Sequence, residues 1–168
     1  MMQATQERDE LAARRADERA RETAREAKEA EKSSYIVGWI AAHADPDTQE
    51  QFRDGLLCRK SILSLIADYA FAAAGVPAGF EEEDWECCEN SACPCGLKDV
   101  TCLPRSIYPA WKVINRNLPE GSTVTFQVSR RCLRPEWDGE GESAAPAIYL
   151  ATIKLPHGPF EFERTVQL

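Results

Sequence analysis

Five cysteines lie close together in one acidic stretch of the chain, and they are the residues best suited to chemistry. The stretch runs from Glu81 to Cys102 and reads EEEDWECCENSACPCGLKDVTC, a spacing of C-C-x4-C-x-C-x6-C. A short loop rich in acid, Gly and Pro buries too little apolar surface to order itself. We therefore expect a covalent or coordinate cross-link among the sulfurs of Cys87, Cys88, Cys93, Cys95 and Cys102.

A structural zinc ion is the cross-link that we predict for these cysteines. Four thiolates complete a tetrahedral shell, and zinc is the usual ion of a closed all-sulfur site. The C-x-C pair around Pro94 departs from the common C-x2-C spacing. Disulfides, an iron–sulfur cluster and unligated thiols are the alternatives, and an odd total of seven cysteines leaves at least one thiol outside any set of disulfides.

The residues around the cysteines argue against catalysis. The neighbouring carboxylates would raise the pKa of each thiol, which disfavours both a nucleophilic thiolate and a thiol redox function. The chain has only two histidines, of which His43 is expected at a helix end and His157 in a turn between prolines. No nucleophile, phosphate-loop or zinc-hydrolase motif is present. We predict a protein that is not an enzyme.

The N-terminal segment is predicted to be a long charged helix. Residues 2–34 contain no Gly or Pro and consist mainly of Ala, Glu, Arg, Lys and Gln, the strongest helix formers. A 3-4 spacing of small residues suits the seam of a coiled coil, formed by Ala13, Ala16, Ala20, Thr23, Ala27 and Ala30. We call residues 1–34 the arm, which is either a solvated helix or a helix that docks on a partner or on copies of itself.

The rest of the chain, residues 35–168, is predicted to be one α+β domain with the Cys-rich loop at 81–103. The helix of the arm turns apolar from Tyr35 to Ala44 and should end at Pro46. An amphipathic core helix is expected over 46–74, with Cys58 as a small packing residue inside it and Gly75 as its stop. A connecting stretch around Trp111 is expected to form a short helix or strand.

Three strands are predicted at the C-terminal end, over residues 123–133, 147–155 and 160–168. Apolar and polar residues alternate in the first and the third, the second resumes strand character, and turn residues separate the segments. The simplest arrangement is a three-stranded antiparallel sheet with one face on the core helix.

The charge balance limits the classes of partner. A formal net charge of −8 disfavours a general electrostatic hold on nucleic acid or an anionic membrane. We expect a cytoplasmic or virion protein that serves assembly or acts as an adaptor, with the arm engaging other subunits. A zinc-containing regulator that contacts nucleic acid through Arg130, Arg131, Arg134 and Trp137 is the alternative. A thiol redox protein that uses Cys87 and Cys88, or Cys93 and Cys95, is the second alternative.

Overall fold

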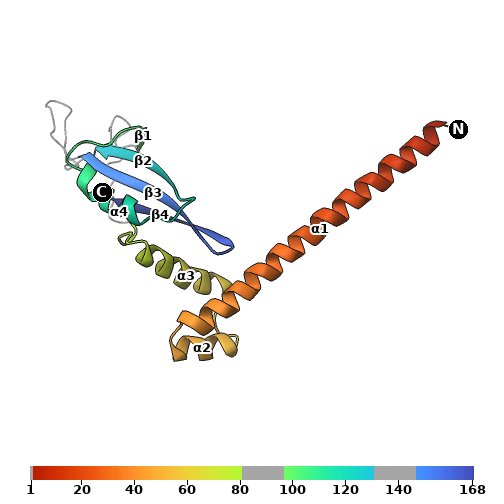
Figure 1. The fold of residues 1–168 in the computed structure, drawn as a ribbon, viewed down its shortest axis with the longest axis horizontal. Helices are drawn as coiled ribbons and strands as arrows, with labels where there is room; N and C mark the ends of the chain where they lie inside the picture. The colour runs from red at the N-terminus through yellow and green to blue at the C-terminus, as the bar shows by residue number, and fades with distance from the viewer. Residues whose placement is uncertain (1, 81–96, 131–146) are drawn as a thin grey trace, which may run out of the picture. The chain divides into compact units, whose positions relative to one another are not determined.

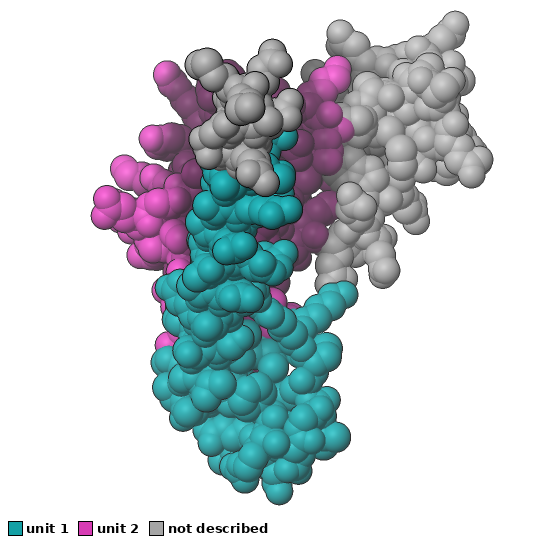
Figure 2. All heavy atoms as spheres, turned by 90° about the vertical axis from the view of Figure 1, so that its right-hand side faces the viewer, with its two compact units in different colours: residues 1–62 teal, residues 63–168 magenta. Residues whose placement is uncertain are grey.

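The computed structural model describes residues 2–80, 97–130 and 147–168. In these ranges the chain forms four helices and four strands (Figure 1). The chain divides into two compact units, residues 1–62 and 63–168, which Figure 2 shows in teal and magenta. The boundary falls within a helix.

Unit 1 is dominated by one uninterrupted helix. Helix α1 spans Met2–His43, 42 residues, which at 1.5 Å per residue gives a length of about 63 Å. Helix α2 spans Pro46–Arg53 and lies beside the C-terminal end of α1 (Figure 1). Asp45 caps α2, because its side chain accepts a hydrogen bond of 2.9 Å from the backbone amide of Thr48. The continuous helix α1 confirms the predicted long charged helix at the N-terminal end.

The predicted core helix over 46–74 is broken in two, so that prediction is wrong in its extent. Helix α2 ends at Arg53, and helix α3 spans Arg59–Ala73. Gly55 adopts a φ of 72°, and its amide donates to the carbonyl of Phe52 while the amide of Leu56 donates to Gln51. This is the Schellman arrangement, in which a left-handed glycine ends a helix by satisfying its last carbonyls.

Helix α3 supplies the helical half of the core of unit 2. Its buried face includes Ile66, Ala70, Phe71 and the flanking Ala74, spaced as one helical stripe. The helix ends at the predicted stop, since Gly75 has a φ of 66° and the amide of the next residue donates to the carbonyl of Phe71.

The sheet of unit 2 has four strands where three were predicted. They are β1 (Lys98–Val100), β2 (Thr123–Arg130), β3 (Ala147–His157) and β4 (Phe160–Gln167), in the order β1-β2-β3-β4 with every neighbouring pair antiparallel. The α+β class and the three longer strands, β2 to β4, were predicted from the sequence and are confirmed. The additional strand β1 is three residues long, pairs Lys98 with Val128, and carries too short a pattern to be predicted from sequence.

One face of the sheet carries the core of unit 2. Register places Val124, Ile153 and Arg164 in one row across β2, β3 and β4, and Phe126, Ala151 and Val166 in the next. Residues of α3 pack on this face, together with helix α4 (Tyr108–Asn117), whose Ile114 belongs to the same buried cluster. The ring of Trp111 meets the ring of Phe126 edge-on, with 4.9 Å between the centroids.

Candidate interaction surface

Only one of the five predicted zinc ligands, Cys102, lies within the described residues, so the zinc site stays a prediction. Cys87, Cys88, Cys93 and Cys95 lie outside those residues. Cys102 follows β1, is exposed, and takes part in no disulfide. Within residues 2–80, 97–130 and 147–168, no group of three or more His, Cys, Asp and Glu side chains is arranged to hold a metal ion.

Cys58 lies on the surface, so the prediction that it packs inside a helix is wrong. It precedes α3, and its carbonyl accepts a hydrogen bond from the amide of Ile62. Its Sγ lies 3.1 Å from Oγ of Ser61. Hydrogen bonding from the Ser61 hydroxyl, and then from the Ser61 amide, holds the pKa of the Cys58 thiol below its ordinary value.

His43 lies at a helix end, as predicted, whereas His157, which was predicted in a turn, lies in a strand. His43 is the last residue of α1, is exposed, and its ring lies 5.5 Å from that of Trp39. His157 is the last residue of β3, and its ring lies 6.1 Å from that of Tyr69. The two belong to different units, and neither contributes to a described cluster of metal-binding side chains.

The arm shows one continuous run of exposed residues. Every residue from 11 to 31 is exposed, although the helix passes through all of them without a break. From residue 11 onward, the buried side chains of α1 are those of Ile36, Trp39 and Ile40, near its C-terminal end. In Figure 1 no other element of unit 1 lies beside the N-terminal half of α1. Secondary-structure propensity, rather than packing within unit 1, accounts for the helix here.

The small residues of the arm form a stripe that the described part of unit 1 leaves open. We call this stripe the arm seam; it consists of Ala13, Ala16, Ala20, Thr23, Ala27 and Ala30, all of them exposed. The one polar group in it is already satisfied, because the Thr23 hydroxyl donates to the carbonyl of Arg19 at 2.9 Å. The seam therefore offers a partner a narrow surface without an unmet polar group.

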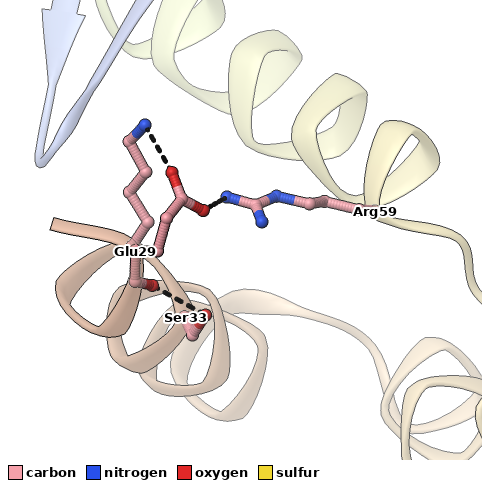
Figure 3. A network of polar contacts seen from close by, with 4 residues as sticks. Glu29, Ser33 and Arg59 are labelled. Carbon is pink, nitrogen blue, oxygen red and sulfur yellow. Dashed lines mark hydrogen bonds and ion pairs between the residues drawn. The ribbon is translucent and has the colours of Figure 1, made fainter. Parts of the chain in front are cut away.

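A small polar network ties the base of the arm to the start of α3 within unit 1 (Figure 3). The Glu29 carboxylate accepts hydrogen bonds from Lys32 at 3.1 Å and from Arg59 at 2.9 Å, and the Ser33 hydroxyl donates to the Glu29 carbonyl. The hydrogen bonds from Lys32 and then Arg59 hold the pKa of Glu29 below its ordinary value. All three charged groups are on the surface, where such pairs contribute little to stability.

Most of the predicted basic and aromatic patch lies outside the described residues. Arg130 ends β2, whereas Arg131, Arg134 and Trp137 lie outside the described residues. None of the helices in the described ranges combines the length and the hydrophobicity that crossing a lipid bilayer requires. Comparison with protein-family models, with curated proteins and with solved structures finds no match to this chain.

Proposed function

We propose that this protein is a non-enzymatic assembly or adaptor component whose arm contacts another protein subunit, in a virion or another large complex. The observation that carries the proposal is the exposure of residues 11–31 on every side of a continuous helix. A helix of this length and composition can form in water by itself, so the exposed arm is preformed for a contact with a partner. A partner that covers the arm seam supplies the tertiary contact that the described part of unit 1 does not.

The composition of the arm also supports a contact role. The seam positions hold small side chains and most of the positions around them hold charged ones, so a partner helix can approach closely along the seam. The arm carries Asp17 and Arg21 as an ion pair at 2.7 Å, four residues apart, which supports the helix independently of any partner.

A position-specific crosslink in cells or in a native extract tests the contact. A photoreactive residue replaces Ala20 in the seam, and in a matched control it replaces Arg25, which points away from the seam. We expect a discrete adduct between this chain and a protein, either a second copy or another polypeptide, from position 20 and not from position 25. Absence of an adduct from both positions, with the protein expressed and folded, contradicts the proposal.

The second part of the proposal is that zinc cross-links the Cys-rich loop. Its support is the density of cysteines in an acidic segment, together with Cys102, which is exposed and available as a ligand next to β1. Elemental analysis should find about one zinc ion per chain. Cys93→Ser with Cys95→Ser should abolish zinc binding, while Cys58→Ser should retain it. Purified protein that binds no zinc under reducing conditions, and whose unfolding is unchanged by chelator, contradicts this part.

A further inference from the structure

We propose that the partner of the arm seam is a second copy of this chain, and that the two α1 helices pair antiparallel with Ala20 of one opposite Thr23 of the other. This inference rests on the proposed function, because it names the subunit that the arm contacts. It is carried by the exposed seam, by the satisfied Thr23 hydroxyl and by the charges that flank the seam.

The seam follows a heptad pattern of positions three and four residues apart. Counting Ala13, Ala20 and Ala27 as position a makes Ala16, Thr23 and Ala30 position d. In an antiparallel pair, each a residue lies in a layer with a d residue of the partner. Placing Ala20 opposite Thr23 of the partner puts Ala16 opposite Ala27 and Ala13 opposite Ala30. Every layer of the seam then joins two small side chains.

The same register places opposite charges together. Arg19 and Glu26 each precede an a position, so both occupy the flank of the seam, and both are exposed. Among the described residues neither makes an ion pair, whereas Arg21 and Glu29 on the same helix do. In the antiparallel register Arg19 of each chain faces Glu26 of the other. The two-fold symmetry of the dimer gives two such pairs.

A parallel pair of the same helices has no matching attraction. Its flanking contacts join a residue that precedes an a position to one that follows a d position in the partner. Glu26 would then face Glu31, and Arg19 would face Ala24, so the charges would repel or fail to meet. The antiparallel register also brings acidic positions 10 and 31 level with each other near its ends. The parallel pair has a like-charge contact as well but no attraction, so the Arg19–Glu26 pairs favour the antiparallel orientation.

Charge exchange in the full-length chain tests the orientation. Sedimentation equilibrium, with reductant present to exclude intermolecular disulfides, should show that the unaltered chain dimerises. Arg19→Glu and Glu26→Arg should each raise the dimer dissociation constant about tenfold, since each replaces two attractions with two repulsions. An equimolar mixture of these two variants should dimerise again, because each chain then carries the charge that the other lacks. Arg25→Glu and Glu18→Arg, on the outward face, should leave the dissociation constant unchanged.

Four results separate the possibilities. A monomeric unaltered chain at about 100 µM overturns the inference, and the proposed function still stands if the position-20 crosslink captures a different protein. Tighter dimerisation of Glu26→Arg indicates the parallel pair and overturns the antiparallel register. A dimer indifferent to both charge changes places the contact elsewhere and also overturns the inference. Weaker dimers of both variants with recovery in the mixture support it, provided that far-ultraviolet circular dichroism shows unchanged helicity.

Discussion

Arg164 is a charged residue on the core-facing side of β4, and its substitution tests how unit 2 holds together. Its guanidinium carbon lies 4.4 Å from the centroid of the Phe71 ring on α3. The same guanidinium forms an ion pair with the Asp68 carboxylate. The Arg164 side chain is 17% exposed, whereas that of Asp68 is 66% exposed. The two interactions of this arginine are therefore in different environments.

These environments predict which interaction dominates. The ion pair contributes less than about 1 kcal/mol, because water screens the exposed carboxylate. The contact with the Phe71 ring contributes about 1–2 kcal/mol, since the ring is buried, and the packed aliphatic stem of Arg164 adds to it. We expect Arg164→Ala to lower the free energy of unfolding of unit 2 by about 2–3 kcal/mol, and Asp68→Asn to lower it by less than about 1 kcal/mol.

Hydrogen exchange of the β3 and β4 amides, read by mass spectrometry, reports the opening of unit 2 separately from unit 1. Lys154→Ala is the matched control, because this exposed strand residue also has an acidic partner, Glu163, at 3.5 Å. It should change the free energy by less than about 0.5 kcal/mol. Equal losses for Arg164→Ala and Asp68→Asn would refute the reasoning, because the ion pair would then account for the whole effect.

Three further predictions concern single positions of unit 1. Gly55→Ala should lower the melting temperature, at a cost of about 1 kcal/mol for the left-handed φ, whereas Gly38→Ala in the interior of α1 should raise it. Hydrogen bonds from the side chain and then the amide of Thr48 lower the pKa of Asp45. The stabilisation by this carboxylate is therefore complete above the ordinary aspartate pKa and is lost as the pH falls through the lowered pKa. The difference in melting temperature between the unaltered chain and Asp45→Ala should shrink toward acid pH. Ser61→Ala should slow alkylation of Cys58 near neutral pH, measured by peptide mapping, because it removes the hydrogen bond that favours the thiolate.

The sheet illustrates which parts of the fold the sequence could predict. Strands β2 and β4 were predictable because apolar and polar residues alternate along them, and β3 because its residues are largely apolar and are bounded by turn signals. Strand β1 was not, since its three residues become a strand only by pairing Lys98, Asp99 and Val100 with β2. That pairing is a tertiary event, which a local pattern does not record.

Gly55 shows how one residue changes both the helix boundaries and the environment of a nearby cysteine, Cys58. The apolar periodicity on its two sides is compatible with a single helix, and only the glycine preceded by Asp54 signals the stop. Breaking the helix there moves Cys58 from an expected helix interior to the position before α3. An assumed packing residue thereby becomes an exposed thiol with a hydrogen-bonded sulfur.

The arm seam was visible in the sequence as a stripe of small residues, but its exposure was not. Exposure depends on what the rest of unit 1 covers, and the apolar residues that are buried, Ile36, Trp39 and Ile40, are confined to the C-terminal end of α1. The cysteines, conversely, were conspicuous in the sequence, yet four of the five predicted ligands lie outside the described residues.

The use of alanine in the seam bears on the kind of assembly that the arm can make. Burying an alanine methyl group yields about 0.8 kcal/mol, against about 1.5–3 kcal/mol for a leucine side chain, so this seam provides a fraction of the hydrophobic free energy of a leucine zipper of equal length. Small side chains also allow the two backbones to approach closely, which makes the fit sensitive to any enlargement. An arm that pairs as proposed should associate reversibly and select its partner by the flanking charges of Arg19 and Glu26.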